Sequence, residues 1–212
     1  MKFKAFLLLG LMITIICFLL KSYVLKKAVA IDDLTVYKMN FGGYERTYYV
    51  HFPPSEKMKS KVPILFNLHG GGGTAKGSVR ITFGRFNELA DKDGFIMVYP
   101  EAVQKSWNNG RKLDETKAWR EDIDDVGFIV KIVETLEAKY KVDRKRIYTT
   151  GMSNGGFMSS RLLCERADLF RGGAILTASI STDFFPNCKP SQPIAVLLMN
   201  STKDPIIPYD GG

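Results

Sequence analysis

The chain has 212 residues, of which 45% are hydrophobic, so it is long enough to form one domain with a substantial core. Its formal net charge is +8. Five lysines and no acidic residue lie in residues 1–30, and subtracting these five charges from +8 leaves +3 for residues 31–212. So small and scattered a charge gives no reason to expect a nucleic-acid partner.

The N-terminal 30 residues have the layout of an export segment. Lys2 and Lys4 precede an uncharged stretch from Ala5 to Leu20, which is short for a membrane span of about 20 residues. Ala28-Val29-Ala30 offers a small-x-small cleavage site, but three lysines separate it from the apolar stretch. Residues 1–30 are therefore either a signal peptide or an uncleaved membrane anchor. Both alternatives place residues 31–212 outside the cytoplasm, secreted, periplasmic or anchored, with membrane contact only through this segment.

The remaining chain alternates between strand-like and helix-like segments. A hairpin over residues 34–52 turns at Asn40 to Gly43, short apolar runs over 63–68 and 95–99 predict buried strands, and a helix is expected over about 83–90. Residues 101–123 are polar and aperiodic, which predicts a long surface loop. Asp125 is expected to cap a helix that follows it, and strands are expected at 146–150, 173–176 and 194–199. This alternation predicts an α/β fold with a mostly parallel sheet and helices on both faces.

The pentapeptide Gly151-Met152-Ser153-Asn154-Gly155 lies between a strand-like and a helix-like run. In such a nucleophile elbow the serine occupies a sharp turn, and the flanking glycines avoid clashes that a Cβ would cause. Ser153 is therefore the candidate nucleophile.

A glycine-rich stretch, Leu68 to Gly73, directly follows the third predicted strand. Attack by serine on a carbonyl generates an oxyanion, which backbone N–H groups stabilise. One donor is expected from this loop, either Gly71 or Gly72, and the other from Asn154. A phosphate-binding loop is the weaker alternative, because Lys76-Gly77-Ser78 inverts the order that a Walker motif needs.

Asp204 follows the last predicted strand, and Pro205 prevents a helix there. In the order Ser, acid, His along the chain, this is the position of the triad acid, which orients the histidine. An ordinary turn residue is the alternative.

Five segments, in this order, resemble the secreted polyhydroxybutyrate depolymerase and feruloyl esterase branch of the α/β-hydrolases: Leu68–Gly73, Ser106–Arg111, Asp124–Ile129, Gly151–Gly156 and Asp204–Tyr209. The resemblance covers residues 35–212. It implies an α/β-hydrolase fold and carboxylic ester hydrolysis through an acyl-enzyme, with Ser153 as nucleophile, Asp204 as acid, and no metal or organic cofactor. The substrate would be a polyhydroxybutyrate, feruloyl or acetyl ester, possibly polymeric.

The chain departs from that family in its histidines, because the triad histidine should follow Asp204 and only His51 and His69 are present. His69 is expected to shape the glycine loop. We therefore expect residues 31–212 to be a catalytic domain that is incomplete at its C-terminus, lacking the last strand and helix of the fold. A serine peptidase or acyltransferase of the same fold, or an inactive binding remnant, are the alternatives.

Three further sites have open interpretations. Cys164 and Cys188 could form a disulfide, which would close a loop of about 25 residues and contribute about 3 kcal/mol, or remain buried thiols. Trp107 could line the substrate pocket or anchor its loop. Of Asp124 and Asp125, one is expected to cap a helix and the other to accept hydrogen bonds from a loop.

Overall fold

The computed structural model describes residues 12–21, 33–58, 60–112 and 115–210. Residues 12–21 form a helix, and no helix in the described ranges combines the length and hydrophobicity that a membrane crossing requires. The predicted cleavage site at residues 28–30 lies outside the described residues, so signal cleavage and membrane anchoring stay predictions.

Seven strands of the described chain form one sheet in the order β1-β2-β4-β3-β5-β6-β7. The first two strands are antiparallel to each other, β2 is antiparallel to β4, and the remaining neighbours are parallel. The strands are β1 (Thr35–Phe41), β2 (Tyr44–His51), β3 (Val62–Leu68), β4 (Ile96–Pro100), β5 (Val142–Met152), β6 (Gly172–Leu176) and β7 (Ala195–Met199). This is the mostly parallel sheet that the sequence predicts.

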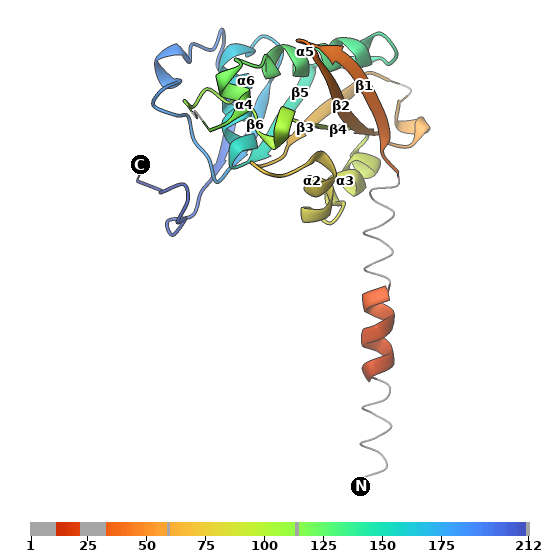
Figure 1. The fold of residues 1–212 in the computed structure, drawn as a ribbon. Helices are drawn as coiled ribbons and strands as arrows, with labels where there is room; N and C mark the ends of the chain where they lie inside the picture. The colour runs from red at the N-terminus through yellow and green to blue at the C-terminus, as the bar shows by residue number, and fades with distance from the viewer. Residues whose placement is uncertain (1–11, 22–32, 59, 113–114, 211–212) are drawn as a thin grey trace.

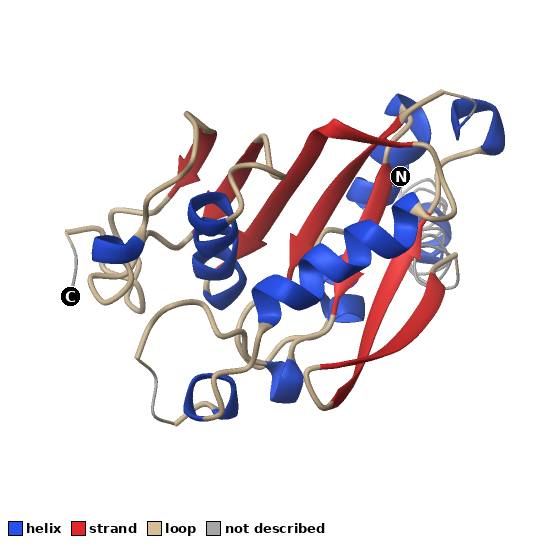
Figure 2. Cartoon of the chain, turned by 90° about the horizontal axis from the view of Figure 1, so that it is seen from above, coloured by secondary structure: helices blue, strands red, loops and turns tan. Residues whose placement is uncertain are grey.

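Helices cover both faces of this sheet (Figures 1 and 2). The helices are α2 (Ala75–Ile81), α3 (Arg85–Asp93), α4 (Lys117–Arg120), α5 (Asp125–Glu137) and α6 (Asn154–Glu165), with short 3-10 turns η1 (Ser55–Met58), η2 (Val103–Lys105) and η3 (Phe185–Asn187). Successive side chains of β4 point to opposite faces of the sheet and so contribute to two different hydrophobic clusters. Ile96 and Val98 pack into the core that includes α5 and α6, whereas Met97 and Tyr99 pack against α2 and α3.

The structure differs from the expected elements in two places: it has one additional helix, and one segment expected on the surface is partly buried. Helix α2 was not predicted, because Gly77 interrupts its apolar spacing; Thr74 caps it by accepting a hydrogen bond from the Gly77 N–H. The segment 101–123 is not a surface loop throughout. Trp107, Asn108 and Asn109 within it are between 1% and 4% exposed.

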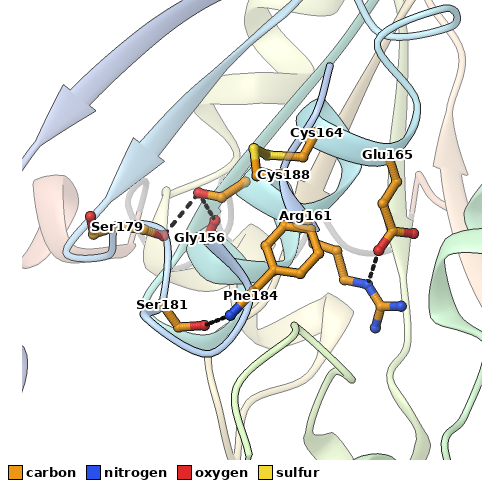
Figure 3. Close-up of a disulfide and its surroundings, with 9 residues drawn as sticks. Gly156, Arg161, Cys164, Glu165, Ser179, Ser181, Phe184 and Cys188 are labelled. Atoms are coloured by element: carbon orange, nitrogen blue, oxygen red, sulfur yellow. Dashed lines mark hydrogen bonds and ion pairs between the residues drawn. A yellow bond between two sulfur atoms is a disulfide. The ribbon is translucent and has the colours of Figure 1, made fainter. Parts of the chain in front are cut away.

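The central strands of the sheet and the strand at its β7 edge differ in how deeply they are buried. The strands β3 and β4 are buried almost throughout, whereas all five residues of the edge strand β7 are exposed. On the β7 side, a disulfide joins Cys164, in the last turn of α6, to Cys188, just after η3 (Figure 3). The two Cα atoms lie 5.0 Å apart.

Candidate active site

The turn between β5 and α6 places Ser153 in an unusual backbone conformation. Its φ is 53° and its ψ is −121°, a region that residues other than glycine avoid at a cost of about 1–3 kcal/mol. The Ser153 N–H donates to Leu176 O over 2.9 Å, which fixes the turn against the end of β6. The serine is half-buried, at the mouth of the turn rather than inside the core.

The glycines on either side of Ser153 are needed because other backbone comes very close. A Cβ at Gly151 would lie 2.9 Å from the Gly156 nitrogen, and one at Gly155 would lie 2.5 Å from His69 O. Both distances are shorter than any normal contact of a side chain, so an alanine at either position would force the elbow open. The local geometry is that of the predicted nucleophile elbow.

The glycine loop after β3 packs directly against this elbow. A Cβ at Gly70 would lie 3.8 Å from Ser153 Cβ, and one at Gly71 would lie 3.5 Å from Asn154 Cβ. The N–H of Gly72 donates to Lys105 O over 2.9 Å. In the described part of the chain, the N–H groups of Gly71 and Asn154 have no hydrogen-bond acceptor. Of the two predicted loop donors, only Gly71 therefore has its N–H free for a ligand.

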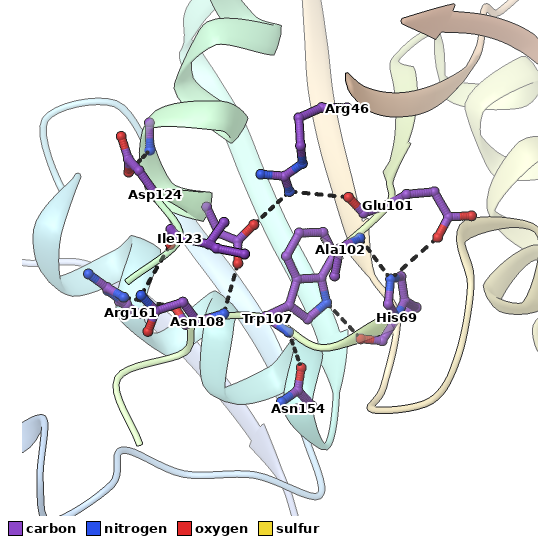
Figure 4. Close-up of polar contacts among 12 residues, drawn as sticks. Arg46, His69, Glu101, Ala102, Trp107, Asn108, Ile123, Asp124, Asn154 and Arg161 are labelled. Atoms are coloured by element: carbon purple, nitrogen blue, oxygen red, sulfur yellow. Dashed lines mark hydrogen bonds and ion pairs between the residues drawn. The ribbon is translucent and has the colours of Figure 1, made fainter. Parts of the chain in front are cut away.

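His69 holds the glycine loop in place (Figure 4). Its Nδ1 lies 2.8 Å from Gly70 O, and its Nε2 accepts a hydrogen bond from the Ala102 N–H over 3.1 Å. The ring is therefore the neutral tautomer with its proton on Nδ1. Burial lowers the pKa of His69 and so favours that neutral form. With both nitrogens engaged, the ring has the structural role predicted for it and no free nitrogen to accept a proton from Ser153.

Trp107 connects the elbow to the glycine loop. Its backbone N–H donates to Asn154 Oδ1 over 2.8 Å, and its indole Nε1–H donates to His69 O over 2.9 Å (Figure 4). The side chain is only 1% exposed and its ring lies 5.0 Å from the imidazole ring of His69. Of the two alternatives for Trp107, these contacts favour an anchor for its loop, because the side chain has almost no surface left for a ligand.

A buried ion pair lies behind this loop. Arg46 Nη2 is 2.6 Å from Asp125 Oδ1, and Asp125 Oδ2 accepts a hydrogen bond from the Asn108 N–H over 2.8 Å. Arg46 also donates to Glu101 O (Figure 4), and its guanidinium lies 3.8 Å from the centre of the Phe128 ring. Burial raises the pKa of Asp125, and the charge of Arg46 opposes that rise. Through its bond to the Asn108 N–H, the ion pair holds the backbone of the residue that follows Trp107.

One of the two adjacent aspartates caps α5 and the other accepts a loop hydrogen bond, as expected. The cap is Asp124, however, so the expectation that Asp125 caps the helix is wrong. Asp124 Oδ1 caps α5 by accepting a hydrogen bond from the Gly127 N–H over 2.7 Å. Asp125 is fully buried and is the acceptor of the loop hydrogen bond. Arg46 was not predicted, although the sequence carries a signal for it: Arg46 alternates with Tyr48 and Val50 on the buried face of β2, where an unpaired charge would be costly.

Asp204 lies after β7, at the same edge of the sheet as Ser153 but two strands away. Its Oδ1 accepts hydrogen bonds from the N–H groups of Ile206 and Ile207, each over 2.9 Å. These two bonds lower the pKa of Asp204 and keep its carboxylate ionised. The structure thus brings Ser153, Gly71 and Asn154 together, and it shows no direct contact between them and Asp204.

Neither histidine of the chain is positioned at Ser153. His51, in β2, is 2% exposed, and its Nε2 lies 2.7 Å from Asp91 Oδ1. Its Nδ1 is 2.9 Å from an Asp33 oxygen, outside hydrogen-bond geometry. Within the described ranges, no group of three or more His, Cys, Asp or Glu residues is arranged to hold a metal ion.

Comparison with known proteins agrees with this geometry. The profile of a family described as esterase PHB depolymerase matches residues 46–201. Feruloyl esterase B of Piromyces equi is 30% identical over 79% of this chain and 31% of that protein, and feruloyl esterase C of Emericella nidulans is 29% identical over 79% and 58%. The crystal structure of a thermostable esterase matches with a TM-score of 0.67 and 21% identity, over 86% of this chain and 50% of that one.

The sheet order, the elbow and the adjacent glycine loop define the chain as an α/β-hydrolase. Its sequence places it further: the chain belongs to the esterase PHB depolymerase family. It spans about half the length of the curated relatives that it matches.

Proposed function

We propose that the protein is a serine carboxylic ester hydrolase that acts through an acyl-enzyme, with Ser153 as the nucleophile. The observation that carries the proposal is the juxtaposition of a strained, half-buried serine with two adjacent backbone N–H groups that lack acceptors, those of Gly71 and Asn154. Membership of an esterase family supports the same chemistry.

In this proposal, Ser153 Oγ attacks the ester carbonyl carbon and the carbonyl oxygen becomes an oxyanion. The N–H groups of Gly71 and Asn154 donate hydrogen bonds to that oxygen, and a single donor of this kind contributes about 10²–10³ in rate. Collapse of the intermediate expels the alcohol, which takes the proton that Ser153 lost. Water then attacks the acyl-enzyme and its oxygen leaves in the acid, while one of its protons restores the Ser153 hydroxyl.

Asp204 is the proposed triad acid. Its ionised carboxylate would orient an imidazole and stabilise the imidazolium that forms when Ser153 loses its proton. Since both nitrogens of His69 are engaged and His51 lies in β2 against Asp91, we assign the base to neither of them. The proposal therefore assigns the base to no described residue.

The proposed substrates are polyhydroxybutyrate, feruloyl esters or acetyl esters. The family name and the names of the two feruloyl esterases support the first two classes. Comparing kcat/KM for hydroxybutyrate oligomers, methyl ferulate and p-nitrophenyl acetate, with a peptide anilide as the negative substrate, ranks the acyl groups. Preferential cleavage of the anilide would favour a peptidase instead.

The nucleophile is tested with p-nitrophenyl butyrate. Ser153→Ala is expected to lower kcat/KM at least about 1,000-fold, because the acyl group then has no acceptor. Ser55→Ala, at an exposed serine in η1, is the matched control and should retain full activity. Equal activity of Ser153→Ala and the control would show that Ser153 is not the nucleophile.

We also propose that the domain acts outside the cytoplasm. The Cys164–Cys188 disulfide supports this location, because such bonds persist in oxidising compartments. The charged and then apolar layout of residues 1–20 supports export. Fractionation of the native cells, with N-terminal sequencing of the recovered protein, separates a cleaved signal from an anchor; recovery only from the cytosol would contradict export.

A further inference from the structure

A cavity of about 410 Å³ lies beside the elbow. Its walls include Arg111, Phe157 and the segment 206–209. Phe157 belongs to the first turn of α6, since its N–H donates to Ser153 O over 3.0 Å. The segment 206–209 begins with Ile206, one of the two residues whose N–H groups bind the Asp204 carboxylate. The cavity is therefore lined by the first turn of the helix that follows Ser153 and by the segment that follows Asp204, whereas Ser153 and Asp204 themselves do not line it.

Arg111 provides the cavity with a cation that lacks a counter-ion. Its guanidinium lies 4.1 Å from the centre of the Phe157 ring, and its Nε donates to Asn109 Oδ1 over 3.3 Å. In the described part of the chain, no carboxylate lies within ion-pair distance of Arg111, and its two terminal nitrogens have no acceptor. Burial lowers the pKa of Arg111, as expected for a cation partly removed from water.

Two carboxylates lie near this guanidinium, and neither is within ion-pair distance of it among the described residues: the charge of Glu115 opposes the fall in the Arg111 pKa, and Asp183 lines the cavity. Lys112 also lines it, and Asp183 accepts a hydrogen bond from the Lys112 backbone N–H over 3.2 Å. Glu115, on the same loop, is exposed and lies outside the lining. A contrast is provided by Arg46, the other arginine stacked on a phenylalanine ring, which is paired with Asp125. Among the described residues, the two terminal nitrogens of Arg111 therefore offer parallel N–H donors without acceptors. A carboxylate can accept both hydrogen bonds at once.

The walls near Arg111 also suit a hydrocarbon chain. Phe157, Ile206 and Ile207 contribute apolar surface, while Asn200 and Ser181 add neutral polar groups. A ligand with an ionised carboxylate at one end and a short aliphatic body fits both features. Inorganic phosphate would use the cation but not the apolar wall.

We propose that Arg111 binds the free carboxylate of an ester that carries a second, ionised carboxyl group on its acyl side, such as a half-ester of an aliphatic dicarboxylic acid at the end of a polyester chain. The inference rests on the proposed function, since it places this carboxylate subsite beside the scissile ester at Ser153. It makes the enzyme selective for chain ends over the interior of a neutral polyester.

Binding is measured by calorimetry in the full chain carrying Ser153→Ala, which prevents turnover. The probes are the monomethyl esters of succinate, glutarate and adipate, each compared with its neutral dimethyl ester. The best monoester is expected to bind at least about 10-fold more tightly than its diester, because hydrogen bonds between charged groups are worth more than neutral ones. Added salt should reduce that preference.

Substitution of the cation then tests the assignment. Adding Arg111→Gln should abolish the preference for monoesters, Arg111→Lys should keep part of it, and Arg85→Gln, at an exposed arginine on α3, should keep all of it. Equal binding of mono- and diesters, or a preference that survives in Arg111→Gln, would overturn the subsite. The comparison of mono- and diesters with Arg111 present decides the matter even if a variant does not fold.

The outcome is separable from that of the proposed function. If esters are not hydrolysed by the protein with Ser153 intact but the monoester preference holds, the carboxylate subsite stands and the esterase assignment fails. If hydrolysis depends on Ser153 while no preference is measured, the esterase assignment stands and the subsite is wrong.

Discussion

The elbow side of the domain and the β7 side are built differently. Around the elbow, His69, Trp107 and Asn154 are at most 4% exposed and hydrogen-bond to one another through side chain and backbone. In β7, the residues from Val196 to Met199 are between 47% and 57% exposed. The proposed nucleophile and the proposed oxyanion donors are therefore held by contacts complete within the described residues, whereas the loop that carries Asp204 follows a strand with little packing.

The proposed nucleophile and the proposed acid are therefore held in place differently: the first by a buried hydrogen-bond network, the second by a loop after an exposed edge strand. Buried polar networks rigidify a site because each unsatisfied group in them is expensive. An edge strand with exposed apolar side chains opens locally at low cost and offers unpaired backbone groups to other chains. Changes to the elbow side should therefore affect global stability, and changes to the β7 side should affect local opening.

The largest expected effect comes from breaking the buried ion pair. Asp125→Ala leaves Arg46 buried without its partner, which is expected to lower the free energy of unfolding by about 3–5 kcal/mol in urea titrations. The neighbouring Asp124→Ala is the matched control, because it removes only a helix cap worth about 1 kcal/mol. Equal losses for the two variants would contradict a special role for the elbow-side network.

The disulfide tests the other side. Replacing Cys164 and Cys188 together by alanine is expected to cost about 3 kcal/mol in the chain-entropy model, for a sequence separation of 24 residues. Hydrogen exchange should show the amides of β7 exchanging faster in this variant while the amides of β3 change only with global stability. A uniform change in all strands would mean that the two sides unfold as one unit.

The smallest effect concerns the pH dependence of the Asp204 loop. Two backbone N–H bonds hold the folded pKa of Asp204 below its ordinary value of about 3.9. Ionised Asp204 therefore stabilises the loop above about pH 4, and this contribution is lost as the pH falls through the lower, folded pKa. An NMR titration of the Asp204 carboxyl carbon should give a midpoint below 3.9. A midpoint at or above that value would show that the two bonds do not persist in solution.

The strand order along the chain could be predicted because the buried strands are short apolar runs bounded by turns. The hairpin turn lies at Gly42 and Gly43, both with positive φ, and Gly94 ends α3 in a left-handed conformation, as its position after Asp93 suggests. The elbow was predictable for a steric reason, since close backbone contacts restrict the positions two residues before and after Ser153, Gly151 and Gly155, to glycine.

The rest depended on contacts between distant parts of the chain. Asp124 and Asp125 are equivalent in the sequence, and the choice between cap and buried acceptor is made by Arg46, which lies 79 positions before Asp125. Trp107 and Asn108 appear in a polar, aperiodic stretch, yet they are buried because their N–H groups find acceptors on Asn154 and Asp125. Polar composition predicts exposure only where no such partner exists.

The backbone of Ser153 also bears on how relatives of this protein can be sorted. Glycine would adopt the same φ and ψ with much less strain, so a lineage released from catalysis would gain stability by replacing the serine. Under the proposed function, retention of serine at this position is a cost that selection maintains. Across related sequences, the residue aligned with Ser153 should separate lineages still under selection for hydrolysis from those that have kept only the scaffold.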